Sequence, residues 1–229
     1  MSEHIIKVWD LPTRLFHWSL AMLVVAAVVT VKIGGNAMLW HGRIGLAIVG
    51  LVVFRIAWGV VGSTYARFTD FVPGPRAIRD YLAGRWDGVG HNPLGALSVL
   101  ALLGVVAFQV GTGLFSNDDI AFNGPLVPAV SSDTSGWLSG LHRQGEWFLY
   151  GLVVLHVAAV LYYVRARRDD ILTPMITGRK RVEGEHREAR GGGVAAFVIA
   201  LTVALGAVWA ASGALLPPPP PPPPANMGW

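Results

Sequence analysis

The chain has 229 residues, of which 53% are hydrophobic and only 14% are charged. A soluble domain carries charge on about a quarter of its residues, so this composition excludes an ordinary soluble enzyme or binding domain. The 18 lysines and arginines outnumber the 14 aspartates and glutamates. These basic residues cluster between apolar segments, which is typical of membrane orientation and gives little support to nucleic-acid binding.

Five apolar segments are long enough to cross a membrane as helices, and they cover residues 15–33, 40–61, 94–115, 147–164 and 194–216. Each is close to the roughly 20 residues that a spanning helix needs, and the alternation of barrel strands is absent. We expect the second helix to begin near Asn36, the third at the N-cap Asn92 before Pro93, and the fourth near Ser135. The first segment has no small-residue cleavage site, so we expect a retained helix rather than a signal peptide.

The lysines and arginines predict which way the chain crosses the membrane. Fourteen of them flank the spans on the side of the N-terminus, whereas the opposite side has only Lys32, Arg43 and Arg143. Cytoplasmic loops carry such an excess. We therefore expect a multi-pass protein of the bacterial inner membrane, in contact with membrane lipid, with its N-terminus in the cytoplasm.

The segments outside the spans also carry structural signals. On the cytoplasmic side, residues 73–83 predict a short amphipathic surface helix with Ile78 and Tyr81 toward lipid. Residues 179–193 are charged and end in glycines, and we expect them to be mobile. The proline run 217–224 predicts an extended spacer on the outer side.

Four histidines, His17, His41, His142 and His156, lie within or at the rims of the apolar segments. His142 and His156 are 14 residues apart, which is nearly four turns and about 21 Å along one helix face. The orientation places His41 and His142 near the outer side, and His17 and His156 near the inner side. Polar residues at such depths are costly and usually functional.

Two histidine pairs at two depths predict two stacked haems, each held by two neutral imidazoles. Because the chain has no cysteine, any haem is held without the covalent C-x-x-C-H attachment, and iron–sulfur ligation by cysteine is excluded. The alternative is that these histidines are interfacial or hydrogen-bonded within the core. The other three, His4, His91 and His186, lie outside the spans, where we expect solvated or capping roles.

Four arginines are candidate partners of haem propionates. Arg14 lies about one turn before His17, while Arg43 and Arg143 adjoin His41 and His142. Arg55 lies within the second span, 14 residues after His41, so it shares that helix face at the inner level. An arginine at this depth needs an anionic partner. Lipid phosphate and simple snorkelling are the alternatives for these side chains.

Three stretches of the chain resemble the prokaryotic cytochrome b561 family, which includes the cytochrome b subunits of nickel–iron hydrogenases. They are Val8-Trp-Asp-Leu-Pro-Thr-Arg-Leu-Phe-His-Trp-Ser-Leu, Gly90-His-Asn-Pro-Leu-Gly-Ala-Leu, and Leu141-His followed by His156. The likeness covers roughly residues 5–180. It implies a four-helix core with two haems b, exchanging electrons with membrane quinone, and with His17, His41, His142 and His156 as axial ligands. The fifth span and the proline tail depart from this pattern.

The sequence thus predicts an all-α integral membrane bundle, with a four-helix di-haem core plus one additional transmembrane helix. Its parts are a cytochrome b domain (1–170), a charged cytoplasmic linker (171–193), a fifth membrane helix (194–216) and a periplasmic proline-rich tail (217–229). No side chain is expected to act as a nucleophile or general acid. We expect an electron-transfer component of a quinone oxidoreductase.

The expected electron path joins a periplasmic-side partner to the quinone pool. The partner is a cytochrome c or a dehydrogenase or hydrogenase subunit. A quinone needs an apolar slot with one or two polar donors, which Arg85, His91 and Asn92 supply on the inner side, or Arg143 and Gln144 on the outer side. Two other functions stay open: a proton or ion transporter with a histidine relay, and a membrane anchor subunit without redox activity.

Overall fold

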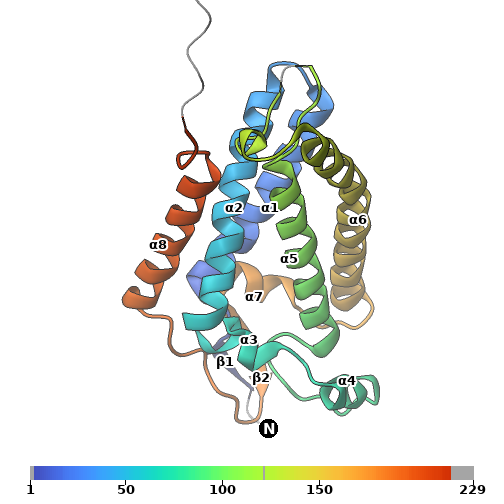
Figure 1. The fold of residues 1–229 in the computed structure, drawn as a ribbon. Coiled ribbons are helices and arrows are strands. Elements are labelled where there is room, and N and C mark those ends of the chain that lie inside the picture. Colours follow the sequence, from blue (N-terminus) through green and yellow to red (C-terminus); the bar gives the residue numbers. More distant parts are fainter. Residues whose placement is uncertain (1–2, 121, 218–229) are drawn as a thin grey trace, which may run out of the picture.

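The computed structural model describes residues 3–120 and 122–217, and its main body is a bundle of long helices (Figure 1). Within the described residues, five helices are long and apolar enough to cross a membrane: α1 (Leu11–Ile33), α2 (Ala37–Val61), α5 (Pro93–Gly113), α6 (Ser132–Arg165) and α8 (Val194–Ala211). They coincide with the five predicted spans, which confirms the membrane helical bundle. Large apolar side chains on their outer faces, such as Met22, Val60 and Val154, are about two-thirds exposed, as expected for contact with lipid.

The helix starts follow capping signals in the sequence. At α1, the Asp10 carboxylate accepts a hydrogen bond from the Thr13 backbone N–H at 2.7 Å. At α5, the Asn92 side chain accepts one from the Gly95 N–H at 2.7 Å, and Pro93 occupies the first turn. This confirms the predicted start of α5, and the start of α2 directly after Asn36 was also predicted. Such caps satisfy backbone donors that the first turn of a helix leaves free.

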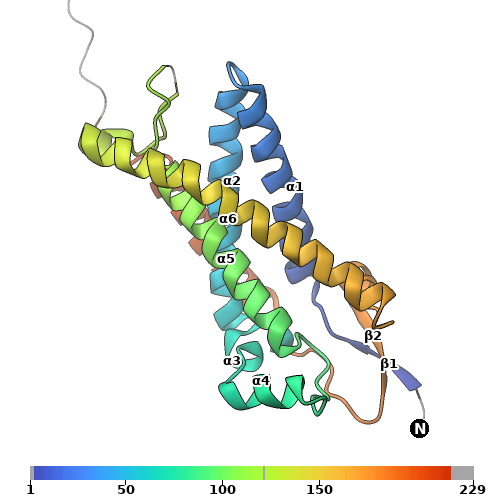
Figure 2. The same cartoon turned by 90° about the vertical axis from the view of Figure 1, so that its right-hand side faces the viewer.

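Helix α2 lies at the centre of the bundle, and α1, α5 and α8 pack against it, while α6 packs along α5 (Figures 1 and 2). An apolar core joins α2, α5 and α6 through four buried residues, Ile48, Val52, Val106 and Leu149. One end of the bundle carries β1 (Glu3–Lys7), α4 (Pro75–Leu82), α7 (Leu172–Thr177) and β2 (Arg179–Glu183). We call this the sheet end. The opposite end, with the connections 34–36 and 114–131, is the loop end.

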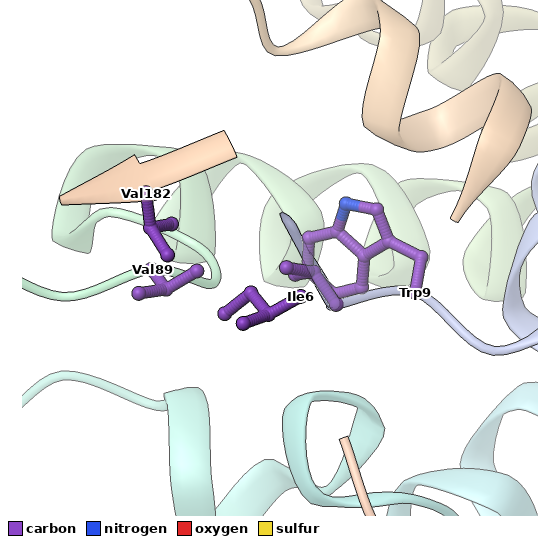
Figure 3. Close-up of a cluster of buried hydrophobic side chains, with 5 residues drawn as sticks. Ile6, Trp9, Val89 and Val182 are labelled. Atoms are coloured by element: carbon purple, nitrogen blue, oxygen red, sulfur yellow. The ribbon is translucent and has the colours of Figure 1, made fainter. Parts of the chain in front are cut away.

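Strands β1 and β2 form a two-stranded antiparallel sheet, in register from Glu3 opposite Glu183 to Lys7 opposite Arg179. The expectation of a mobile segment over residues 179–193 was therefore wrong for the part that forms β2. No strand pattern marks β2 in the sequence, because Val182 is the single apolar residue among its four charged ones. Figure 3 shows the result: Ile6 and Trp9, Val182 of β2, and Val89 before α5 meet in a small buried cluster.

The short elements complete the two ends. The 3₁₀ turn η1 (Thr64–Ala66) and helix α3 (Phe68–Phe71) lead from α2 to α4, and a second 3₁₀ turn, η2 (Val127–Ala129), precedes α6. Helix α4 confirms the predicted surface helix. Its Tyr81 was expected to face lipid, but the Tyr81 hydroxyl hydrogen-bonds the Tyr163 hydroxyl of α6, so this side chain packs against protein. All but the first residue of the predicted tail, 217–229, lies outside the described residues.

The close contact between α2 and α3 yields a stability prediction. A methyl group added at the buried Gly59 would collide with the Phe68 ring. Gly59→Ala should therefore destabilise the bundle by about 1–3 kcal/mol through overpacking, seen as a lower thermal midpoint by circular dichroism in detergent. Gly151→Ala is the matched control, because a methyl group there has nothing within 4 Å. Equal midpoints for the two variants would contradict this packing.

Candidate functional site

The four membrane histidines form two facing pairs. The imidazole centres of His17 (α1) and His156 (α6) lie 6.3 Å apart near the sheet end. Those of His41 (α2) and His142 (α6) lie 6.2 Å apart near the loop end. We call these the sheet-end pair and the loop-end pair. The structure thus brings together the residues that the sequence placed at equal depth, and α6 supplies one member of each pair.

Backbone carbonyls orient both rings of the loop-end pair. His41 Nδ1 lies 3.0 Å from the Ala27 carbonyl of α1, and His142 Nδ1 lies 3.0 Å from the Gln109 carbonyl of α5. A carbonyl oxygen only accepts hydrogen bonds, so in both contacts Nδ1 carries the proton and donates. This fixes the tautomer in which Nε2 has a free lone pair. Both rings can therefore offer Nε2 to a metal ion.

The loop-end pair faces a cavity of about 260 Å³ between α1, α2, α5 and α6. Its wall is mostly apolar. The His142 ring lies close to the backbone of Gly113, because a methyl group added at Gly113 would lie 2.9 Å from His142 Cε1. Phe122 from the α5–α6 connection also lines the cavity, with its ring centre 6.5 Å from that of His41. At the rim, Lys32 and Glu146 form an ion pair at 3.6 Å. The cavity is suited to a planar, largely apolar group with polar edges.

Among the described residues, buried polar atoms without a hydrogen-bond partner lie near both pairs. Four are at the sheet end, namely Thr13 Oγ1, Arg14 Nε, His17 Nδ1 and His91 Nδ1, and two line the loop-end cavity, namely Gln109 Oε1 and the Tyr150 hydroxyl. Native proteins leave few buried polar groups unsatisfied, and each such group needs an explanation. Both ends of the bundle therefore have spare donors and acceptors for a polar ligand.

The candidate arginines differ in their surroundings. Arg14 donates from Nη1 to the Ile176 carbonyl. Arg55 is only 3% exposed, donates to the Ala66 carbonyl at 3.1 Å, and lies over the rings of Phe68 and Phe71. Near the loop end, two further arginines are exposed: Arg43 lies over the Trp40 ring at 5.0 Å, and Arg143 is at the cavity wall. A propionate role for these four stays a prediction.

His91 departs from the expected solvated or capping role. Its ring packs between Trp9 and Phe71, with ring centres 4.5 Å and 4.7 Å away. Burial, with a smaller contribution from the positive charge of Arg55, lowers the pKa of His91 to about 3. The imidazole is thus neutral at physiological pH. The expectation failed because Trp9 and Phe71, which bury it, come from remote segments of the chain.

Asp10 is a further residue that sequence reasoning missed. Its position before Leu11-Pro12 is a recognisable N-cap signal. Besides capping α1, its carboxylate accepts hydrogen bonds from the indole of Trp58 at 3.0 Å and from the hydroxyl of Ser63. These two contacts connect the start of α1 to the end of α2, and no local pattern predicts them.

The comparison with protein families agrees with the membrane helical bundle. The family model of prokaryotic cytochrome b561 matches residues 8–178, so the chain belongs to this family. It is thus a b-type cytochrome, which carries haem b in membrane electron transfer. No solved structure matches the chain significantly.

The chain is also similar to hydrogenase cytochromes. It is 25% identical over 220 residues to the probable Ni/Fe-hydrogenase 1 B-type cytochrome subunit of Escherichia coli (strain K12), which covers 77% of this chain and 92% of the relative. The probable Ni/Fe-hydrogenase B-type cytochrome subunit of Azotobacter vinelandii is 26% identical over 214 residues, with 76% and 87% covered. That of Azotobacter chroococcum mcd 1 is 27% identical over 205 residues, with 72% and 81% covered.

The burial of His91 predicts a pH dependence of stability. The ordinary pKa of 6.5 applies in the unfolded chain, against about 3 in the folded protein. Between these values the unfolded chain binds a proton at His91 that the folded protein does not, so His91 makes the folded protein less stable as pH falls through this window. His91→Phe should keep the contacts with Trp9 and Phe71 and remove this loss of stability at low pH.

Thermal midpoints at pH 7.5 and 4.5 measure the effect. The decrease between the two pH values should be smaller for His91→Phe than for the wild type. His186→Phe, which changes a half-buried histidine on the same end, should keep the wild-type decrease. Parallel pH profiles for His91→Phe and the wild type would contradict the buried, neutral state of His91.

Proposed function

We propose that the chain carries two haems b and passes single electrons across the bacterial inner membrane. The loop-end pair, His41 and His142, would ligate one haem iron, and the sheet-end pair, His17 and His156, the other. This proposal rests on one observation. Two imidazoles face each other at both levels, and their ring centres are nearly equally far apart, 6.2 Å at the loop end and 6.3 Å at the sheet end.

The ring separations fit bis-imidazole ligation. A metal ion binds an imidazole nitrogen at about 2 Å, and the ring centre lies roughly 1 Å further back, so two rings on opposite sides of one metal have centres about 6 Å apart. The carbonyl contacts of His41 and His142 leave Nε2 for the iron and orient the rings, as partners of metal-bound histidines usually do. When bound, haem b supplies a reversible one-electron Fe(III)/Fe(II) couple.

The arginines support this assignment by their placement. Arg14 and Arg55 would balance propionate charge at the sheet end, and Arg43 and Arg143 at the loop end. Along α6 the two ligand levels are 14 residues, about 21 Å, apart. That span is a large part of the roughly 30 Å apolar thickness of a bilayer, so two haems at these levels would give the electron a path across it.

Charge and the names of the relatives support which partner we assign to each end of the path. Fourteen lysines and arginines flank the spans at the sheet end, which supports a cytoplasmic location for it. Because the similar proteins are named as hydrogenase cytochrome subunits, we propose that a hydrogenase subunit, or another dehydrogenase or a cytochrome c, docks on the periplasmic loop end.

Quinone is proposed to react at the sheet end, beside His91 and Asn92. The unpartnered Nδ1 of His91 offers the polar group that an apolar quinone slot needs. The third candidate there, Arg85, pairs with Asp80 at 2.6 Å. On the loop end, Arg143 and Gln144 have exposed side chains, which suits a slot less well. Family membership favours this function over a histidine-based transporter or a redox-inactive anchor.

The ligand assignment predicts paired losses of haem. His41→Ala and His142→Ala should each remove the same haem, and His17→Ala and His156→Ala the other, because an iron that loses one of two axial ligands is held weakly. Reduced-minus-oxidised spectra with redox titration of purified variants separate the two haems by midpoint potential. His186→Ala serves as the control and should retain both. If two variants of one pair lost different haems, the assignment would be refuted.

The quinone site predicts a difference between the two pairs in quinol oxidation. Duroquinol added without oxygen should reduce the haem that remains in His142→Ala, because the sheet-end haem next to the quinone site is intact. The haem that remains in His156→Ala should stay oxidised with duroquinol but be reduced by dithionite. Rapid reduction of the His156→Ala protein by duroquinol would instead place the quinone at the loop end.

A further inference from the structure

The fifth membrane helix, α8, lies outside the stretch that matches the family, residues 8–178, yet it packs along α2 at the centre of the bundle (Figure 1). We propose that α8 completes the sheet-end histidine site. By covering Trp58, it keeps the indole in place, and Trp58 in turn holds the Asp10 carboxylate as a fixed negative charge below His17. This inference rests on the proposed haem ligation by His17 and His156.

One face of α8 is built for close contact with α2. Ala200 and Ala204, one turn apart, are fully or almost fully buried against Phe54 and Trp58. Small residues at this spacing let membrane helices approach closely. The Phe197 ring adds edge contacts to Phe54 at 5.8 Å and Trp58 at 6.3 Å. The indole, which is 0% exposed, is therefore enclosed by α8.

The opposite face of α8 contacts lipid instead. Ile199 and Val203, each one position before a buried alanine, are 54% and 50% exposed. Buried positions and lipid-exposed positions thus lie next to each other along α8. A bulky substitution can be placed on either face, which gives the experiment below an internal control.

The segment that precedes α8 also packs closely against Trp58. Gly192 has φ +64°, and a methyl group there would lie 2.8 Å from the Trp58 ring and 2.7 Å from the Ser63 nitrogen. Only glycine fits such a conformation without strain. The neighbouring Gly191 forms a β-bridge with Ser63, and the Thr64 N–H donates to the Arg190 carbonyl at 2.9 Å. This segment fixes both Trp58 and Ser63.

Trp58 and Ser63 act on Asp10. The Trp58 Nε1–H and the Ser63 hydroxyl both donate to Asp10 Oδ2, while the Thr13 N–H donates to Oδ1 at 2.7 Å. Three donors around an acceptor-only group are the arrangement that stabilises a carboxylate anion. Asp10 is only 7% exposed, so its negative charge is poorly screened by water.

Asp10 is well placed to influence the sheet-end haem. It is the N-cap residue of α1, seven residues before His17, so the two residues are about 10 Å apart along the helix axis. A negative charge at that distance inside protein favours the more positive, ferric state of the iron. Asp10 is therefore a positioning residue that lowers the potential of the sheet-end haem, and Trp58 with α8 keeps it there.

Asp10→Asn tests the charge directly. Asparagine caps a helix as well as aspartate does, so α1 should remain intact while the charge is lost. The midpoint potential of the sheet-end haem, identified as the one missing in His156→Ala, should rise. The midpoint of the loop-end haem should not change. An unchanged sheet-end midpoint in Asp10→Asn, with both haems bound, would overturn the role of Asp10.

Ala200→Phe tests the role of α8, because a phenyl ring on the buried face forces α8 away from Trp58. Its matched control is Ile199→Phe on the lipid face. Ala200→Phe should move the sheet-end midpoint and leave the loop-end midpoint alone, and Ile199→Phe should leave both. Trp58→Phe, which keeps an aromatic ring but lacks the Nε1 donor, should also move only the sheet-end midpoint.

Failure of this inference differs from failure of the proposed function. If Asp10→Asn, Ala200→Phe and Trp58→Phe each bind two haems and keep the wild-type sheet-end midpoint, only the role of α8 and Asp10 is overturned. A wild-type protein without two haems, or one in which His17 and His156 serve different haems, would overturn the ligand assignment itself.

Discussion

Two pairs of imidazoles that face each other across the bundle, at two depths, constrain where α1, α2 and α6 can lie. Helix α6 carries one histidine of each pair, but their partners lie on different helices, His17 on α1 and His41 on α2. Directly packed helices have axes about 8–10 Å apart. A group that fits between facing rings needs more space than this, so α6 must lie further from α1 and α2 than direct packing would place it. Helix α5 keeps α6 there, because its contacts with α2 and α6 form the core around Val106 and Leu149. The bundle is thus organised around the space between the histidines.

The two ends of the bundle differ in how their histidines are held. At the loop end, backbone carbonyls orient both rings, and Phe122 lines the cavity beside His41. At the sheet end, His17 Nδ1 and His91 Nδ1 have no partner, and Arg55 and Asp10 bring opposite charges close by. Unpartnered buried polar atoms also occur at the loop end, where Gln109 Oε1 and the Tyr150 hydroxyl line the cavity. The proposed quinone site at the sheet end therefore depends on the free Nδ1 of His91 itself.

Much of the fold could be predicted from sequence because lipid imposes simple rules. Apolar length gave the five spans, and caps such as Asn92 gave their starts. The 14-residue step on α6 and the basic loops together gave the equal depths of the histidine pairs. These signals are local, or depend only on the spacing of residues along one helix.

What could not be predicted depends on contacts between remote segments. Strands β1 and β2 are separated by most of the chain, and the run of charges in β2 resembles a solvated segment. His91 was expected to be solvated because it lies outside the apolar spans, but Trp9 and Phe71 bury it. Arg55 was expected to need an anion, and the structure surrounds it with the Ala66 carbonyl and two phenyl rings and brings the remote Asp10 carboxylate close by. The network of Asp10, Trp58 and Ser63 likewise exists only in the folded protein.

The haem content of the purified protein tests the central claim most directly. Pyridine haemochrome spectra give moles of haem b per mole of chain, and low-temperature electron paramagnetic resonance of the oxidised protein reports the axial ligands. Two haems b per chain, both low-spin with bis-imidazole signals, are predicted from the two facing pairs. A ratio near one, or a high-spin signal from a five-coordinate iron, would contradict ligation by both pairs.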